Sequence, residues 1–278
     1  MDINYHFGFS KKHHPQLIKY ILDHDILFDG SDDDDSVGVD IYASNLYWPM
    51  LEEILKSDRI PYVGEMIFNK KELLAAEWMI VRSKWSYGWS EPQKDFPFSH
   101  ITFSDEEACG KCYYGLIQRA PFQIKKAPSW GRRNFFSLFD KRDVLFVSDK
   151  ARSVFEKENI CGIEFSEVRN KNGNSKLSNI NQLVISTVLP EGFVASNMSC
   201  CKVYRCPECG KKRYFVPGTE KIVFERGIFG DAPDIVKSGD LFGETVGVSR
   251  ILIRQKVYRV LVDNKLDRNL IFYPIDLV

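Results

Sequence analysis

The chain has 278 residues, of which 44% are hydrophobic and 13% aromatic, enough for one large domain or two ordinary ones. Lysine and arginine together number 38, as do aspartate and glutamate, so the formal net charge is zero. Global electrostatic attraction to nucleic acid or to an anionic membrane is therefore excluded, and a charged partner would have to meet a local patch.

The amino-terminal stretch lacks the apolar core of a secretory signal peptide, and no run approaches the ~20 apolar residues that span a bilayer. We therefore expect a cytoplasmic protein without a membrane partner. The seven cysteines are an odd number in a chain without an export signal, which argues against a disulfide framework. Free thiols or a metal site are the expected uses of these cysteines.

The first hundred residues mix helices and strands. Apolar spacing predicts helices over 15–23 and 47–57, and strands over 36–42 and 60–68. Asn69, followed by Glu72, is typical of a helix start and predicts a helix over 70–81. The turn-rich segment that follows places a boundary near residue 104. We expect an α/β-mixed N-terminal domain over 1–104 and a second domain over 105–278.

Residues 21–40 hold eight aspartates and no lysine or arginine. Such concentrated negative charge can imitate a phosphate backbone and attract a basic nuclease, which makes the central four aspartates candidate partner-binding residues: Asp32, Asp33, Asp34 and Asp35. A solvated acidic turn is the simpler alternative. A calcium loop is rejected, because Asp34 stands where the loop needs glycine and Asp40 replaces the bidentate glutamate.

The segment 84–98 is rich in aromatic residues and proline. Trp85 and Trp89 are candidate partner-binding residues, since aromatic side chains anchor many interfaces. Packing in the protein core is the more common explanation for such side chains.

The C-terminal half contains two segments of similar pattern, 143–168 and 240–278. In the first, a short strand is followed by Ser148 as helix cap, a helix, and a strand at 163–168. The second segment has the same order. A short strand at 240–242 is followed by Ser249 as helix cap, a helix through Val260 and Leu261, and the strand "LIFYPI". The chain is therefore predicted to be α+β, with mixed or antiparallel sheets and short helices.

Two C-x-x-C pairs, Cys109 with Cys112 and Cys206 with Cys209, are separated by 93 residues. Four thiolates suit a tetrahedral Zn²⁺ site, and each pair can direct two sulfurs from one tight turn. A zinc-ribbon-like site is therefore expected. Such a site has no open position for water, so the zinc would be structural and would fasten the intervening chain.

Two other uses of these cysteines are conceivable from the sequence. A thioredoxin-type pair opens a helix, whereas Cys209 precedes a β-rich run that indicates a hairpin. A local site that combines Cys200 and Cys201 with Cys206 and Cys209 would need adjacent cysteines to bind one ion. Both are less favourable than the site that joins the distant pairs. Cys161, Cys200 and Cys201 have no assigned role.

The two pairs, together with "LLAAEWMIVR" and "FVSDKARSVFEKENICGIEF", resemble the double-CXXCG motif family of bacterial proteins over most of residues 65–215. The C-terminal helix–strand segment is similar to a second immunity family, which contains domain of unknown function 1629. The resemblance implies that Cys109, Cys112, Cys206 and Cys209 are the ligands. Tyr113 departs from the family, which has glycine after the second cysteine, and strains a left-handed turn.

Some members of the double-CXXCG family are named as immunity proteins of contact-dependent toxin systems. The resemblance therefore implies a non-enzymatic protein that binds and neutralises a cognate toxin. The alternative is a nucleic-acid-binding ribbon, because residues 200–226 hold seven basic groups against three acidic ones, with Tyr204, Tyr214 and Phe215 between them. An enzyme is the least favoured class, since no pair of carboxylates has informative spacing.

Overall fold

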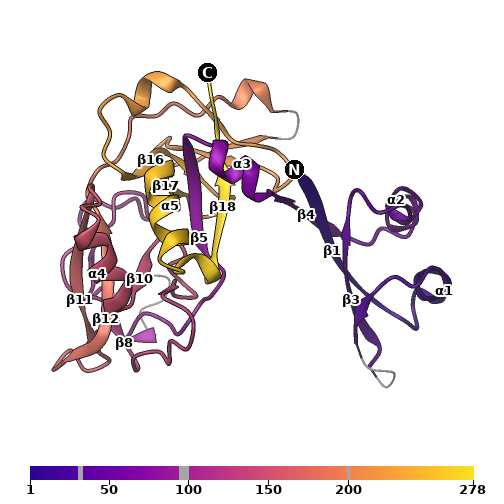
Figure 1. The fold of residues 1–278 in the computed structure, drawn as a ribbon, viewed down its shortest axis with the longest axis horizontal. Helices are drawn as coiled ribbons and strands as arrows, with labels where there is room; N and C mark the ends of the chain where they lie inside the picture. The colour runs from indigo at the N-terminus through magenta and orange to yellow at the C-terminus, as the bar shows by residue number, and fades with distance from the viewer. Residues whose placement is uncertain (31–33, 94–99, 199–200) are drawn as a thin grey trace. The chain divides into compact units, whose positions relative to one another are not determined.

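The computed structural model describes residues 1–30, 34–93, 100–198 and 201–278 (Figure 1). It is α+β, as predicted, with mixed and antiparallel sheets. The chain forms two units, one made of Met1–Glu72 with Pro217–Lys221 and the other of Leu73–Val216 with Ile222–Val278. The turn-rich segment after residue 84 predicts a boundary near residue 104. The structural division falls earlier because residues 78–83 form an internal strand of a sheet of the second unit, paired on both sides.

The first unit is a four-stranded antiparallel sheet with two helices. Its strands lie in the order β2-β3-β1-β4, and β1 pairs with both β3 and β4. The chain order βαββαβ with this strand order is the ferredoxin-like arrangement. The elements are β1 (Asp2–Ser10), α1 (Pro15–Asp23), β2 (Phe28–Asp29), β3 (Ser36–Tyr42), α2 (Trp48–Ser57) and β4 (Tyr62–Ile67).

The core of the first unit lies between the sheet and its two helices. Alternate residues of β1 and β3 point to this side, including Phe7, Phe9 and Val39, while Leu17 and Leu51 come from the helices. The apolar side chains on one face of the sheet therefore pack against the apolar stripe of each helix and form one layer. Both helices and β3 agree with the sequence prediction, whereas β1 was not predicted.

A six-stranded sheet forms the centre of the second unit. Its strand order is β13-β14-β16-β17-β5-β18, with β5 antiparallel to both of its neighbours. The elements are β5 (Trp78–Ser83), β13 (Lys202–Arg205), β14 (Lys212–Phe215), β16 (Ile235–Phe242), β17 (Val248–Arg254), α5 (Gln255–Asp263) and β18 (Leu270–Pro274).

The helix predicted over 70–81 is wrong beyond its first six residues. α3 (Lys70–Ala75) starts with the expected reciprocal cap, in which Glu72 N donates to Asn69 Oδ1 and Asn69 N donates to Glu72 Oε2. The following residues form β5 instead. Trp78 to Val81 are all buried, so the strand faces core on both sides and its apolar run lacks the alternation that marks a half-buried strand.

The second unit also contains a five-stranded sheet, in the order β8-β11-β12-β10-β9. Its elements are β8 (Gln123–Ile124), β9 (Phe135–Phe136), β10 (Leu145–Val147), α4 (Asp149–Lys157), β11 (Ile163–Asn170) and β12 (Lys176–Ile185). Two short strand pairs complete the unit. One is antiparallel and joins β6 (Phe103–Ser104) to β7 (Ile117–Gln118). The other is parallel and joins β15 (Val223–Phe224) to β19 (Asp276–Leu277).

The two predicted helix–strand segments share one topology. β10 and β11 flank β12 and are joined through α4, while β17 and β18 flank β5 and are joined through α5. Each is a split β-α-β unit, in which an antiparallel strand lies between two parallel ones. The Ser148 cap is confirmed, since its Oγ accepts from Ala151 N at 3.2 Å. The corresponding role of Ser249 is wrong, because Ser249 lies within β17 and α5 begins after Arg254.

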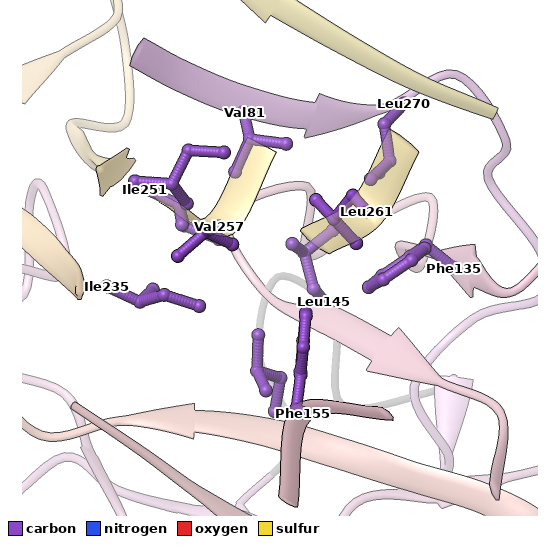
Figure 2. A pocket seen from close by; sticks show the side chains of 11 residues that line it. Val81, Phe135, Leu145, Phe155, Ile235, Ile251, Val257, Leu261 and Leu270 are labelled. Carbon is purple, nitrogen blue, oxygen red and sulfur yellow. The ribbon is translucent and has the colours of Figure 1, made fainter. Parts of the chain in front are cut away.

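Both split units contribute to one apolar core. Phe155 and Leu261, from α4 and α5, are buried in the same cluster as Leu145 and Leu270. Figure 2 shows these side chains around a small cavity. Its volume is about 10 Å³, and its lining is entirely apolar. The space is about that of a single water, and it offers no polar partner. The cavity is therefore a packing defect rather than a ligand site.

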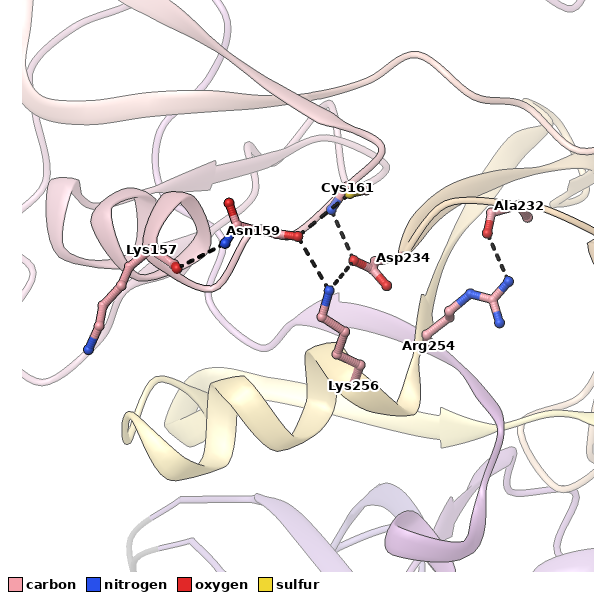
Figure 3. A network of polar contacts seen from close by, with 7 residues as sticks. All are labelled: Lys157, Asn159, Cys161, Ala232, Asp234, Arg254 and Lys256. Atoms are coloured by element: carbon pink, nitrogen blue, oxygen red, sulfur yellow. Dashed lines mark hydrogen bonds and ion pairs between the residues drawn. The ribbon is translucent and has the colours of Figure 1, made fainter.

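A buried carboxylate links the two split units. Asp234 accepts from Cys161 N at 3.0 Å and from Lys256 Nζ at 2.9 Å (Figure 3). Lys256 Nζ also donates to Asn159 O at 3.3 Å, so it connects α5 to the turn after α4. Cys161 thus contributes its backbone to the structure, and its side chain is exposed.

Candidate metal centre

The first cysteine pair lies in the loop between β6 and β7. Pairing of Ser104 with Ile117 closes the base of this loop. Within it, Cys109 N donates to Tyr114 O at 2.8 Å, and Tyr113 N donates to Cys109 O at 2.8 Å. These two hydrogen bonds fold the segment into a tight turn that presents Cys109 and Cys112 on one side.

The second pair lies at the end of the β13–β14 hairpin, where Arg205 pairs with Lys212. Cys206 N donates to Lys211 O at 3.1 Å, and Gly210 N donates to Cys206 O at 3.0 Å. These bonds connect the same relative positions as those in the first loop. Both C-x-x-C segments therefore form the same type of turn, as expected for two halves of a ribbon-like site.

The residue after each second cysteine has a left-handed backbone. Gly210 has φ of 70° and Tyr113 has φ of 57°. Glycine adopts this conformation freely, whereas a side chain carries a cost of about 1–2 kcal/mol. The left-handed conformation expected at Tyr113 is confirmed, and the first turn forms with a tyrosine at this position.

The four cysteine sulfurs come together in one cluster. Cys109 Sγ lies 3.6 Å from Cys206 Sγ, and Cys112 Sγ lies 3.6 Å from Cys209 Sγ. All four sulfurs lie within 4.8 Å of one another. Four sulfurs about 2.3 Å from a central ion would be separated by about 3.8 Å in a regular tetrahedron. The cluster therefore fits a tetrahedral metal ion.

The surroundings of the thiols shift their pKa values in opposite directions. The backbone N–H of Cys209, together with that of Glu208, lowers the pKa of the Cys206 thiol to about 6. Burial raises the pKa of the Cys112 thiol to about 12, because a thiolate there would be poorly solvated. A bound dication would favour the thiolate form of all four groups. With four protein ligands, the coordination shell of such an ion would be closed.

Side chains from the two turns also contact each other outside the sulfur cluster. Glu208 Oε2 lies 3.5 Å from Cys109 Sγ. Lys211 Nζ lies 4.7 Å from the centre of the Tyr114 ring and 2.5 Å from Glu191 Oε1. The roles of Tyr114 and Glu191 were not predicted, since neither belongs to a recognisable motif. The contacts of Glu208 with Cys109 and of Lys211 with Tyr114 hold the second turn against the first, while Glu191 positions the Lys211 amine.

Cys161 and Cys201 do not belong to the cluster. Among the described residues, the group that could hold a metal consists of Cys109, Cys112, Cys206 and Cys209. Cys201 is partly buried elsewhere, and Cys200 lies outside the described residues. The hairpin expected around Cys206 and Cys209 is confirmed, so the pair does not open a helix as a thioredoxin-type pair would.

The acidic candidates are described only in part, because Asp32 and Asp33 lie outside the described residues. Asp34 is exposed, and its Oδ1 accepts from Ser36 N at 3.0 Å. Asp35 accepts from Ser10 Oγ at 2.7 Å and from Lys12 N at 2.9 Å. The Ser10 hydroxyl, followed by that N–H, lowers the pKa of the Asp35 carboxyl. Asp35 therefore stabilises the turn after β1.

The two tryptophan candidates have different surroundings. Trp85 packs against Trp130 and Phe136 at the edge of a core cluster, and the Arg133 guanidinium carbon lies 3.8 Å from the centre of its ring. Trp89 is 43% exposed and lies beside Phe139. Core packing therefore accounts for Trp85, whereas Trp89 is part of the surface.

Several residues of the basic segment 200–226 make contacts within the protein itself. Lys211 is paired with Glu191, and Arg213 is buried and donates to Thr245 O. Tyr214, one of the three expected stacking residues, is buried in a core cluster. Fewer groups of this segment are therefore available to nucleic acid than the sequence suggests.

The chain matches no protein-family model and no curated protein. The proposed relation to the double-CXXCG family thus remains a prediction from the motifs. None of the helices in the described ranges is both long enough and apolar enough to cross a membrane.

Proposed function

We propose that the four cysteines bind one Zn²⁺ ion with a structural role. The supporting observation is the cluster of four sulfurs within 4.8 Å, delivered by two turns of the same hydrogen-bond pattern. Four thiolates are a preferred ligand set of Zn²⁺, and they leave no position for a reacting water. The ion would join the β6–β7 loop to the β13–β14 hairpin and would stabilise the fold rather than catalyse a reaction.

On this scaffold, the protein acts as an immunity protein that binds and neutralises a protein toxin. The proposal follows the resemblance of the two C-x-x-C pairs and their flanking segments to the double-CXXCG family. A metal-fastened scaffold suits this function, because a rigid surface loses little conformational entropy when it binds its partner.

The exposed pair Trp89 and Phe139 is the candidate contact surface. Their ring centres lie 5.5 Å apart, and the two residues are 43% and 45% exposed. Phe139 N donates to Gly88 O at 3.0 Å, and Ser90 N donates to Asp140 Oδ1 at 3.1 Å. The backbone that carries both rings is therefore held in place, and large aromatic side chains presented in this way are typical binding anchors.

A growth-rescue experiment tests this function. The protein is co-expressed with the toxin candidate encoded beside its gene, and growth and binding of the two purified proteins are measured. We expect rescue by the native chain and its loss in the double variant Trp89→Ala with Phe139→Ala. Phe215→Ala, which truncates another exposed phenylalanine, is the matched control and should still rescue growth.

Failure of the native chain to protect the cell, together with salt-dependent retention on DNA or RNA, would refute the immunity function. It would favour the nucleic-acid-binding alternative instead.

A further inference from the structure

A cleft of about 540 Å³ in the second unit carries an excess of positive charge. It lies at the ends of β5 and β16 and at the start of β17. Its charged lining residues are four basic ones and a single acidic one: Arg82, Lys84, Arg142, Arg250 and Asp143. Ser86 and Ser249 add hydroxyl groups. The volume is within the range of small-molecule sites, and the charge favours an anion.

Two of the arginines are cross-strand neighbours on one face of the six-stranded sheet. β17 pairs with β5 so that Leu252 lies opposite Ile80, and continuing that register places Arg250 opposite Arg82. Leu252 and Ile80 belong to one core cluster, so the residues two positions further along each strand share that face. Like charges opposite each other destabilise a sheet, and an anion bound between them would remove the repulsion.

Arg250 is the most buried of these cations, since Arg82, Lys84 and Arg142 are exposed. Its Nε is fully buried and has no hydrogen-bond partner, and no ion pair of Arg250 exists among the described residues. Its guanidinium carbon lies 5.2 Å from the centre of the Phe242 ring, which compensates for only part of the lost hydration. Burial lowers the pKa of this guanidinium, and the charge of Arg82 lowers it further. Burial of an unpaired charge costs free energy, and a bound counter-ion would reduce this cost.

Arg82 is held in position for such a ligand. Its Nε donates to the Tyr273 hydroxyl at 2.9 Å, and its guanidinium carbon lies 5.2 Å from the centre of the same ring. Tyr273 comes from β18, the next strand of the sheet. The orientation of Arg82 is therefore fixed by its neighbour, and less entropy is lost when a ligand binds.

We propose that this cleft binds a small organic phosphate, with the phosphate group between Arg82 and Arg250. The guanidinium group presents N–H donors in a planar fork that matches phosphate oxygens. Four cations against one carboxylate favour a dianionic phosphate over a single carboxylate. Lys84 and Arg142 are exposed and complete the charge around the ligand. This assignment is independent of the cysteine site and of the toxin.

Calorimetry and thermal unfolding of the full chain test the proposal, with inorganic phosphate, a nucleoside 5′-monophosphate and succinate as probes. We expect both phosphates to bind and to raise the melting temperature, with succinate at least about tenfold weaker. Arg250→Gln should weaken phosphate binding by at least about tenfold. Arg259→Gln, which changes an exposed arginine on α5, is the matched control and should bind as the native chain does.

If Arg250→Gln does not fold, the double variant Lys84→Gln with Arg142→Gln replaces it, since both side chains are exposed. This variant should also weaken phosphate binding while the circular dichroism spectrum stays unchanged. Absence of phosphate binding to the native chain, or equal binding by the cleft variant, would overturn the proposal. So would a single-stranded oligonucleotide that binds far more tightly than the mononucleotide, because the cleft would then be part of a nucleic-acid surface.

Discussion

Replacement of Cys112 by serine should remove most of the stability that the metal provides. Cys112 is 3% exposed, and its sulfur lies 3.6 Å from that of Cys209. A serine hydroxyl does not ionise in the physiological range and is a poor zinc ligand, so the site loses one of its four bonds. The first turn is then no longer fastened to the second.

The magnitude follows from the chain that the metal closes. The two cysteine pairs are separated by 93 residues. In the chain-entropy model, a cross-link that closes a loop of about 100 residues stabilises the folded state by about 4.7 kcal/mol. For a unit of this size, a loss of that order lowers the melting temperature by about 10–20 °C.

The assay is urea and thermal unfolding of metal-loaded protein, with metal content measured on the same samples. Cys161→Ser is the matched control, because Cys161 is exposed and outside the sulfur cluster, and its effect should stay within about 0.5 kcal/mol. Chelation should reduce the stability of the native chain by a similar amount and should change Cys112→Ser little. Equal stability of the two serine variants, or of the native chain before and after verified metal removal, would refute this reasoning.

Three further predictions concern single positions. Both Gly210 and Tyr113 have positive φ, a conformation that favours glycine. Gly210→Ala should therefore destabilise the metal-loaded protein by about 1 kcal/mol, and Tyr113→Gly should stabilise it by a similar amount. Urea unfolding measures both changes, and a change of the opposite sign at either position would contradict the prediction. Phe155→Ala should cost about 3–5 kcal/mol in the same measurement, since Phe155 is 2% exposed in the shared core; a loss below about 1 kcal/mol would contradict that packing. Ser148→Ala should cost about 1 kcal/mol because it removes the cap of α4, whereas Ser249→Ala removes no cap and should change the stability by less than about 0.5 kcal/mol.

Acidification should release the metal. Protons compete with the ion for the four sulfurs, so metal affinity falls as the pH decreases. Metal content after dialysis at neutral and at mildly acidic pH measures this effect. Full retention of the metal at a pH well below neutrality would indicate ligands other than thiolates.

Local patterns in the sequence predicted the elements that depend on local interactions. The apolar stripe of α1 and the alternation of β3 are visible within a few residues, and both elements have the predicted bounds. The four clustered cysteines were also found from the sequence, because each C-x-x-C pair is a local motif and one metal ion can join two such motifs at any separation.

Features that depend on distant partners were not predicted. The cap at Asn69 and the apolar run after it predict a helix through residue 81, whereas pairing with β17 and β18 makes residues 78–83 a strand. The same pairing brings Arg82 beside Arg250, which are far apart in the sequence and belong to no motif. The cleft around them therefore becomes visible only when the strand register is known.

X-ray absorption spectroscopy of the purified protein, combined with elemental analysis, tests the metal centre most directly. We expect one zinc ion per chain, with four sulfur neighbours at about 2.3 Å. A chain that contains no metal after purification in the presence of zinc, or a first shell dominated by nitrogen or oxygen, would contradict the closed four-cysteine site.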